Sequence, residues 1–327
     1  MWKMMRKSLP GLLALGLLSA GLALANTGGA DAEGNGQPEA SPVSIAVLVN
    51  DLGNPYFQAL AASARATARA ELGADARVTV VSSGYGIERQ RAQLLAAQAE
   101  GHRLIIISAA HPAALSPVID ELRADDIAVV AVDVAVSGAH ITITTYNDQA
   151  GFMSCEHLAV ELDGAGRVGI LSGPPTASFL ARVSGCEEAL ADFPDIEIVA
   201  HEDSGASYVG GIEAMTRLLA RHADLDAVFS VSDLAAQGAA TAARVSDRAE
   251  VRIASVDGSP AVVQALQAGG TPLLNTAAQF PRLMGSAAVE RGLHFLRTGD
   301  VAEDMVLIRA DIIHAGNAGR YCDWQRC

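Results

Sequence analysis

The stretch that decides the fold lies at residues 44–72 and reads SIAVLVNDLGNPYFQALAASARATARAEL. Its first part, Ser44–Asn50, is a short apolar run, which predicts a strand buried on both faces. Asn54 then stands in a capping position and Pro55 in a first turn, so a helix is predicted from Pro55 to Leu72. A buried strand followed by a helix is the first half of a βαβ unit, in which the next strand runs parallel.

Apolar runs and helical patterns continue to alternate along the chain. The further predicted strands are Val78–Ser82, Leu104–Ser108, Ala128–Val132, Arg167–Leu171, Ile196–Ala200, Ala227–Ser230, Val251–Ser255 and Leu273–Ala277. The further predicted helices are Ile87–Gly101, Ala113–Asp125, Gln149–Leu162, Ala177–Phe193, Val209–Arg221, Leu234–Val245, Pro260–Ala268 and Pro281–Arg297. This alternation predicts an α/β fold with two doubly wound parallel-sheet lobes, and a single eight-fold barrel is the alternative.

The pattern also predicts where the lobes begin and end. It restarts with a helix at Gln149, and a long helix comes late in the chain. Lobe one is therefore predicted to hold residues 44–145 plus 280–308, and lobe two residues 146–279 plus 309–327. Three chain crossings would form the hinge, with a ligand cleft between the lobes.

The first residues indicate export. Three cations, Lys3, Arg6 and Lys7, precede an apolar run that ends in Ala23-Leu24-Ala25, small residues of the kind a signal peptidase reads. The alternative is a membrane anchor, but the run is shorter than the roughly 20 residues of a bilayer span. We therefore predict a cleaved signal peptide at residues 1–25, a flexible leader at residues 26–43 and a periplasmic protein.

Composition excludes some partners. The 327 residues carry a formal net charge of −14, and an acidic surface repels phosphate backbones, so nucleic acid is not an expected partner. Hydrophobic residues make up 50% of the chain, enough to bury a core.

Four cysteines are present, and an exported protein can form disulfides. Four cysteines allow three pairings, and four free thiols are a further alternative. Cys155 and Cys186 fall in the first two predicted helices of lobe two, with one strand between them. Cys322 and Cys327 fall in a short tail. We therefore predict the pairs Cys155–Cys186 and Cys322–Cys327.

Polar and aromatic side chains follow several predicted strands. In doubly wound sheets, ligands bind beyond the carboxyl ends of the strands. The residues found there are Asn50–Phe57, Asp133, Ser232–Asp233, Asp257 and Gln279. Carboxylates and amides make paired hydrogen bonds to vicinal hydroxyls, and aromatic faces cover the C–H face of a ring. These residues therefore favour a polyhydroxylated ligand.

Six segments carry a family resemblance, in order and at the family's spacing. They are Asn54-Pro55-Tyr56-Phe57, Val130-Ala131-Val132-Asp133, Arg182-Val183-Ser184-Gly185, Ala227–Asp233, Ser255-Val256-Asp257-Gly258 and Ala278-Gln279-Phe280-Pro281. Between about Ser44 and Ile313 the chain resembles a type I periplasmic binding protein of the sugar ABC transport class, similar to ribose-binding proteins.

The resemblance implies a set of ligand contacts. These are Asn54, Tyr56, Phe57, Asp133, Arg182, Ser232, Asp257 and Gln279. Three positions depart from the ribose pattern: Val134 and Ser232 stand where an arginine and an asparagine are usual, and Ala206, or a neighbour such as Ser207 or Tyr208, stands where an aromatic usually stacks. The implied ligand is therefore a small polar molecule, a monosaccharide or related polyol, whose identity stays open.

The resemblance also implies a function without catalysis. The protein would capture its ligand as a monomer and deliver it to the membrane permease of an ABC transporter. The alternative is a sensor that presents its closed form to a chemoreceptor or sensor kinase. No cofactor or metal is expected, because the histidines show no metal-ligand spacing. Cys155-Glu156-His157 is no catalytic pair, because consecutive helix residues point in different directions. An exported enzyme and a two-lobed transcription regulator are the remaining, weaker alternatives.

Overall fold

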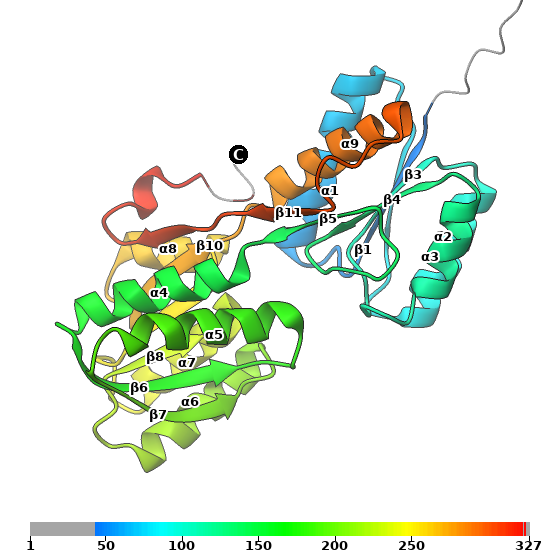
Figure 1. Ribbon diagram of the computed structural model, residues 1–327. Helices are drawn as coiled ribbons and strands as arrows, with labels where there is room; N and C mark the ends of the chain where they lie inside the picture. The colour runs from blue at the N-terminus through cyan, green and yellow to red at the C-terminus, as the bar shows by residue number, and fades with distance from the viewer. Residues whose placement is uncertain (1–42, 323, 325–327) are drawn as a thin grey trace, which may run out of the picture. The chain divides into compact units, whose positions relative to one another are not determined.

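The computed structural model describes residues 43–322 and 324 (Figure 1). Its first sheet has the strand order β11-β5-β4-β3-β1-β2, and all neighbouring strands are parallel. The strands are β1 (Ile45–Val49), β2 (Val78–Ser82), β3 (Leu104–Ile107), β4 (Ala128–Val132), β5 (Ile141–Thr145) and β11 (Met305–Ile308). Its helices are α1 (Pro55–Leu72), α2 (Ile87–Ala99), α3 (Ser116–Ala124) and α9 (Pro281–Thr298). We call the part built on this sheet lobe one.

The second sheet has the order β12-β10-β9-β8-β6-β7, in which β12 alone runs antiparallel to its neighbour. The strands are β6 (Ala165–Ser172), β7 (Asp195–Asp203), β8 (Ala227–Ser230), β9 (Arg252–Asp257), β10 (Leu273–Ala278) and β12 (Asp311–His314). Its helices are α4 (Asn147–Glu161), α5 (Ala177–Ala191), α6 (Tyr208–Arg221), α7 (Asp233–Val245) and α8 (Pro260–Ala268). We call the part built on this sheet lobe two.

The predicted fold class is confirmed, and the single barrel is wrong, because the strands form two separate open sheets. The chain leaves the first sheet after β5, returns to it through α9 and β11, and leaves again for β12. Strands β5, β11 and β12 were not predicted. Strand β11 has a weak sequence signal because it is a four-residue edge strand whose Met305 and Leu307 are exposed.

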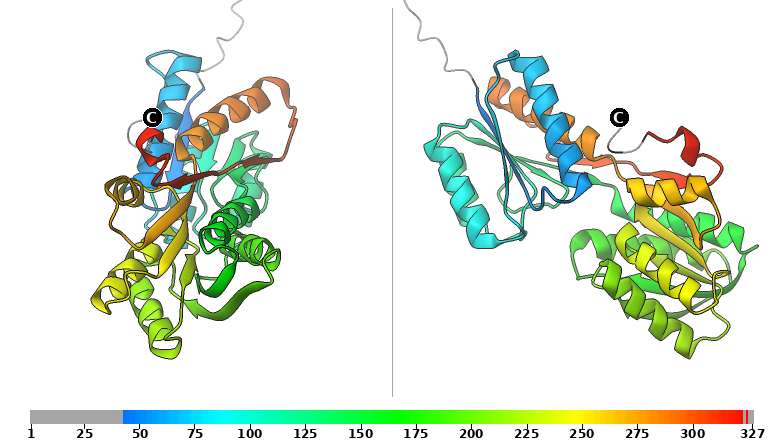
Figure 2. Two further views of the ribbon diagram at one scale, coloured as in Figure 1. Left: turned by 90° about the vertical axis from the view of Figure 1, so that its left-hand side faces the viewer. Right: turned by 180° about the vertical axis from the view of Figure 1, so that it is seen from behind.

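Helices cover both faces of the first sheet, as a doubly wound sheet requires. On one face, α1 and α9 lie side by side although they are far apart in the sequence (Figures 1 and 2). Their buried residues share a hydrophobic cluster with β1, β3 and β4. Helices α2 and α3 pack on the opposite face around Leu94 and Ile119. This two-sided cover explains why β1 and β4 are wholly apolar and buried.

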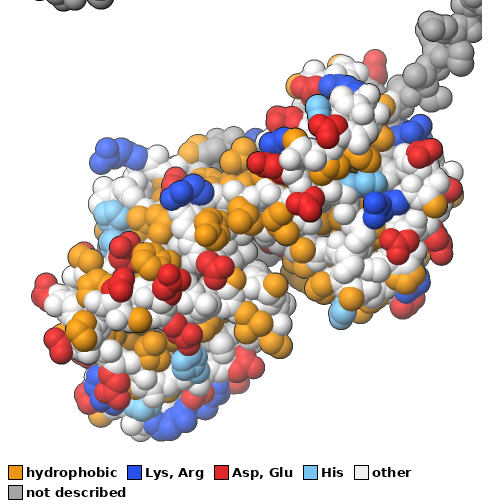
Figure 3. Space-filling view, viewed as in Figure 1, with side chains coloured by type: hydrophobic (Ala, Val, Ile, Leu, Met, Phe, Trp, Pro, Cys, Tyr) orange, Lys and Arg blue, Asp and Glu red, His pale blue; other side chains and the backbone are white. Residues whose placement is uncertain are grey.

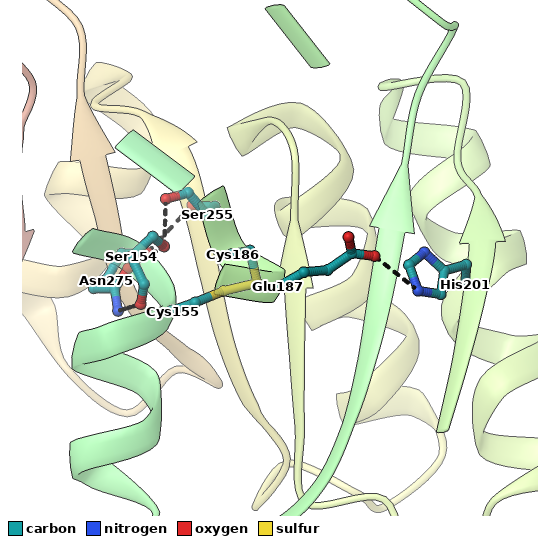
Figure 4. Close-up of a disulfide and its surroundings, with 7 residues drawn as sticks. All are labelled: Ser154, Cys155, Cys186, Glu187, His201, Ser255 and Asn275. Carbon is teal, nitrogen blue, oxygen red and sulfur yellow. Dashed lines mark hydrogen bonds and ion pairs between the residues drawn. A yellow bond between two sulfur atoms is a disulfide. The ribbon is translucent and has the colours of Figure 1, made fainter. Parts of the chain in front are cut away.

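A disulfide links the first two helices of lobe two. Cys155 on α4 and Cys186 on α5 are bonded, with an S–S distance of 2.00 Å (Figure 4). Both side chains are fully buried. This predicted pair is confirmed. The second predicted pair, Cys322–Cys327, includes Cys327, which lies outside the described residues.

The predicted signal peptide at residues 1–25 and the leader, apart from Val43, also lie outside the described residues. Within the described part of the chain, no helix is both long and apolar enough to span a bilayer. Acidic side chains are dispersed over the face shown in Figure 3, in keeping with the net charge of −14.

Candidate ligand-binding site

The first candidate cluster surrounds Asp133, directly after β4. Its backbone takes the left-handed conformation, with φ at 66°, so the chain turns sharply there. The Tyr56 hydroxyl donates to Oδ1 of Asp133 at 3.2 Å, and the Ser108 hydroxyl donates to Oδ2 at 3.3 Å. The lobe-one carboxylate is therefore held by two neutral hydroxyl donors.

The first turn of α1 supplies Tyr56, and its neighbours Asn54 and Phe57 stabilise this helix. The Asn54 side chain caps the helix, since its Oδ1 accepts the Tyr56 backbone N–H at 2.9 Å. Phe57 is 4% exposed and belongs to the hydrophobic cluster beneath β1. The structure thus brings Tyr56 to Asp133, whereas Asn54 and Phe57 hold the helix that carries it.

Two lobe-one residues that act on Asp133, Ser108 and Tyr85, were not predicted, whereas Asn50 was. Ser108 follows β3, and Asn50 follows β1 and donates to the Ser108 hydroxyl oxygen at 3.3 Å. Tyr85 lies in the loop after β2, is 58% exposed and has a φ of 61°. Burial raises the pKa of Tyr85, and the charges of Asp133 and Asp51 raise this pKa further. Ser108 and Tyr85 each follow a strand, so the strand-end rule that found Asn50 would have found them as well.

The second candidate cluster surrounds Asp257, at the end of β9. Its Oδ1 accepts from Nη1 of Arg182 at 3.1 Å and from Nε2 of Gln279 at 2.8 Å. Its Oδ2 accepts from the backbone N–H of Asp233 at 3.1 Å. Three of the predicted ligand residues, Arg182, Asp257 and Gln279, are therefore in direct contact.

Arg182 is held in place from several sides. It is 4% exposed, its Nε donates to Asn147 Oδ1 at 2.8 Å, and its Nη1 donates to the Val231 carbonyl oxygen at 2.8 Å. Three hydrogen bonds, of which the third goes to Asp257 Oδ1, and a cation–π contact with the Phe179 ring hold the guanidinium. The arginine therefore orients Asp257 and leaves little freedom at this end of the site.

Two glycines bring α4 and α5 into backbone contact beside Arg182. A Cβ atom on Gly151 would collide with the Arg182 carbonyl oxygen, and one on Gly185 would collide with the Asp148 carbonyl oxygen. The disulfide lies next to these contacts, because Cys155 comes four residues after Gly151 on α4 and Cys186 directly follows Gly185 on α5. Beside it, Ser154 donates to the Ser255 carbonyl oxygen at 2.9 Å and anchors α4 to β9.

Asp233 and Ser232 lie behind Asp257. Ser232 caps α7, since its hydroxyl accepts the Ala235 N–H at 3.4 Å, and it also donates to the Ala206 carbonyl oxygen. Asp233 is 1% exposed and accepts from Ser255, Thr276 and Ser259, the shortest contact being 2.6 Å. The Asp233 carboxylate is thus occupied by protein donors and supports Asp257 through its N–H.

The charges of the two clusters act on one another. Burial raises the pKa of Asp133 to about 6, against lowering effects of the Arg182 charge and the Tyr56 and Ser108 hydrogen bonds. The Asp257 charge adds to the rise in the Asp133 pKa. Burial also raises the pKa of Asp257, and the Arg182 charge opposes this rise. Burial raises the pKa of Asp233 to about 7, and the Asp257 charge adds to that rise. Arg182 therefore acts electrostatically on aspartates from both lobes.

The departures from the ribose pattern leave part of the site without large side chains. Val134 follows Asp133, and Ala206 takes a left-handed conformation with φ at 50°. Tyr208, two residues on, has its hydroxyl 3.0 Å from Thr241 Oγ1. Tyr85 is the exposed aromatic whose pKa responds to the Asp133 charge.

Hydrogen bonding is the chemistry that these side chains offer. Both carboxylates have lone pairs beyond those used by their protein donors. In residues 43–322 and 324, no three His, Cys, Asp or Glu side chains are grouped as metal ligands.

Two doubly wound lobes with polar side chains at the ends of their strands define a solute-binding protein of the type I periplasmic class. The chain belongs to the family described as periplasmic binding protein domain, which its sequence matches over residues 45–298. The predicted resemblance is thereby confirmed, and the chain is a binding protein rather than an enzyme.

Relatives and solved structures agree with this family. The chain is 25% identical to the D-apiose import binding protein of Paraburkholderia graminis over 84% of this chain and 88% of the relative. It is 25% identical to the ribose import binding protein of Escherichia coli over 76% of this chain and 82% of the relative. A sugar-binding protein of a Bacillus halodurans sugar ABC transporter superposes with a TM-score of 0.77 at 25% identity, covering 85% of this chain and 99% of that one.

Proposed function

We propose that this protein binds a small polyhydroxylated ligand, a monosaccharide or related polyol, between its two lobes. One observation carries the proposal. Each lobe places an aspartate at the end of a strand, and each aspartate is oriented by donors that leave lone pairs for a ligand. A pair of fixed carboxylates suits vicinal hydroxyl groups, each of which donates one hydrogen bond.

The residues proposed to contact ligand follow from their placement. Asp133, Asp257, Arg182 and Gln279 offer charged and amide groups, and Tyr56 offers a hydroxyl. Ser108 and Tyr85 join this set because Ser108 donates to Asp133, and because Tyr85 is an exposed aromatic residue whose pKa is raised by the Asp133 charge. Asn54 and Ser232 serve the site mainly as helix caps, and Phe57 supports Tyr56.

We further propose that the protein works in import. Its relatives are named import binding proteins for D-apiose and ribose, which favours transport over sensing. In this proposal a signal peptide at residues 1–25 directs the monomeric protein to the periplasm. In this proposal lobe one comprises residues 44–145 plus 280–308 and lobe two residues 146–279 plus 309–327, with the Trp324 side chain packed in the lobe-one cluster. The loaded protein then delivers its ligand to the permease of an ABC transporter.

A binding screen tests the ligand class. Isothermal titration calorimetry with D-ribose, D-apiose, D-allose, myo-inositol and glycerol should give saturable heat with at least one of them. The same titration with Asp133→Asn should lose most of that heat, because the amide cannot replace a carboxylate as acceptor on both oxygens. A wild-type protein that binds none of the pentoses, hexoses or polyols would refute the proposed function.

A further inference from the structure

Trp324 lies in the tail that follows β12 of lobe two, yet it packs in lobe one. Its side chain is 6% exposed and belongs to the hydrophobic cluster of Tyr56, Phe57 and Met284. The segment around it was predicted to sit with lobe two. Trp324 also lies beyond residues 45–298, the part of the chain that matches the family.

One contact of Trp324 reaches the lobe-one cluster. Its ring lies 5.3 Å from the Tyr56 ring at an interplanar angle of 79°, an edge-to-face arrangement. Phe57 packs on Tyr56 in the same way, at 5.3 Å and 90°. Tyr56 therefore packs against two aromatic rings, and its hydroxyl, which donates to Asp133, also lies 3.1 Å from Met284 Sδ.

A second contact reaches the lobe-two cluster. The indole Nε1–H donates to the Gln279 backbone carbonyl oxygen at 3.0 Å, and the bond is buried. The Gln279 backbone N–H donates to the Asp257 carbonyl oxygen at 2.8 Å, while its side chain donates to Oδ1 of Asp257 at 2.8 Å. A buried indole N–H needs a hydrogen-bond partner. The partner of the Trp324 N–H is Gln279, the residue that orients Asp257.

We propose that Trp324 is a positioning residue for the ligand site, which fixes Tyr56 through its ring and Gln279 through its N–H. The inference rests on the proposed function, because it assigns a role to the two aspartates that these residues orient. Trp324 acts through Tyr56, which donates to Asp133, and through Gln279, which donates to Asp257. This residue of the C-terminal segment is thereby part of the site's support.

A ligand-free measurement separates positioning from general core packing. In wild type the Tyr56 hydrogen bond lowers the pKa of Asp133, so a loosened Tyr56 should let that pKa rise. The other groups acting on Asp133 are Ser108, Arg182 and Asp257, and Tyr85 on the neighbouring loop. Trp324→Ala leaves these groups in place, so carboxyl-carbon NMR should show Asp133 titrating at higher pH than in wild type.

The matched control is Phe295→Ala. Phe295 packs against the same hydrophobic cluster but contacts His140 instead of the site. It should lower stability without moving the Asp133 titration. Trp324→Phe keeps a ring beside Tyr56 and loses only the N–H, so it should restore most of the wild-type titration. If Trp324→Ala does not fold, sugar affinity carries the test through the Gln279 contact: Trp324→Phe should bind more weakly than Phe295→Ala, and equal affinities would overturn the inference.

Calorimetry with the sugar found in the screen completes the test. Trp324→Ala should bind about tenfold more weakly and Trp324→Phe about threefold more weakly, as expected when one hydrogen bond or its orientation is lost. A folded Trp324→Ala protein with wild-type Asp133 titration and affinity would overturn the inference alone. An equal shift of Asp133 in Phe295→Ala would also overturn it. Failure of wild type to bind any probe would instead refute the proposed function, while the NMR result still decides the role of Trp324.

Discussion

The carboxylate clusters of the two lobes are built differently. In lobe one, Asp133 is held by the hydroxyls of Tyr56 and Ser108, which carry no charge. In lobe two, Asp257 is held by the Arg182 cation, the Gln279 amide and a backbone N–H. A cation stabilises a neighbouring carboxylate more strongly than a hydroxyl does. Lobe two therefore holds its carboxylate in an ion pair, whereas lobe one holds its carboxylate by hydroxyl groups alone, with a pKa raised to about 6.

The largest expected difference concerns stability. Asp257→Ala should lower the free energy of unfolding by about 3 kcal/mol or more, because it leaves the buried Arg182 cation without its carboxylate. Asp133→Ala breaks no ion pair and should change the free energy of unfolding by less than about 1 kcal/mol. Urea unfolding followed by circular dichroism measures both. Equal losses of unfolding free energy in the two variants would show that the Arg182 ion pair does not distinguish the two clusters.

The disulfide gives a second contrast between the lobes. It closes a loop with a sequence separation of 31 in lobe two. Replacing both Cys155 and Cys186 by Ala should cost about 3–4 kcal/mol in the chain-entropy account. Affinity should stay close to wild type, because the glycine contacts and the Arg182 hydrogen bonds remain. Chemical unfolding and calorimetry of the double variant check both parts, with reduced wild type as control. Unchanged stability would contradict this account.

Ligand affinity gives a third and smaller effect. Asp133→Ala should weaken sugar binding by about 1.5–3 kcal/mol, the usual cost of losing a hydrogen bond to a charged group. The control is Asp195→Ala, since Asp195 is exposed at the start of β7. Calorimetry at pH 7.5 should show wild-type affinity for the control. An Asp133→Ala protein that binds as tightly as the control would remove Asp133 from the site.

The smallest effect concerns pH. The pKa of Asp133 is raised to about 6, so at pH 5 about one tenth of the carboxyl is ionised and affinity should fall about tenfold from its value at pH 7. Asp133→Asn should flatten this dependence in a calorimetric pH series.

Stability should move in the opposite direction over the same range. The folded pKa values of Asp133 and Asp233, about 6 and about 7, exceed the ordinary value of 3.8. The native state therefore binds more protons than the unfolded state between about pH 4 and 7, and these two groups lower the free energy of unfolding as pH rises through that window. Weaker binding at pH 5 without this gain in stability would point to acid unfolding rather than to Asp133.

Much of this architecture could be predicted, because local signals specify it. The apolar run before Asn50 and the cap at Asn54 define β1 and the start of α1 without tertiary information. Asp133 and Asp257 follow their strands and were found by that rule. Ser108 and Tyr85 obey the same rule and were missed because it was not applied to the second and third strands.

Other parts of the site could not be predicted from local sequence. Nothing near Trp324 indicates that it contacts Tyr56, because that contact joins segments more than 260 residues apart. The strand β5 was missed because its ITITT sequence is half polar, and β11 and β12 are short edge strands. Such elements form because partner strands are already in place, and the partner's identity is a property of the whole fold.

The backbone contact between α4 and α5 shows that a binding site also depends on positions that carry no side chain. Gly151 and Gly185 offer a ligand no charge, no hydroxyl and no ring. They contribute empty volume, into which the Arg182 and Asp148 carbonyl groups fit. A comparison of sites by their functional groups would pass over both positions, yet a single methyl group at either would displace the helix that aims Arg182. The specificity of the site is therefore encoded in part by residues that could never touch the ligand.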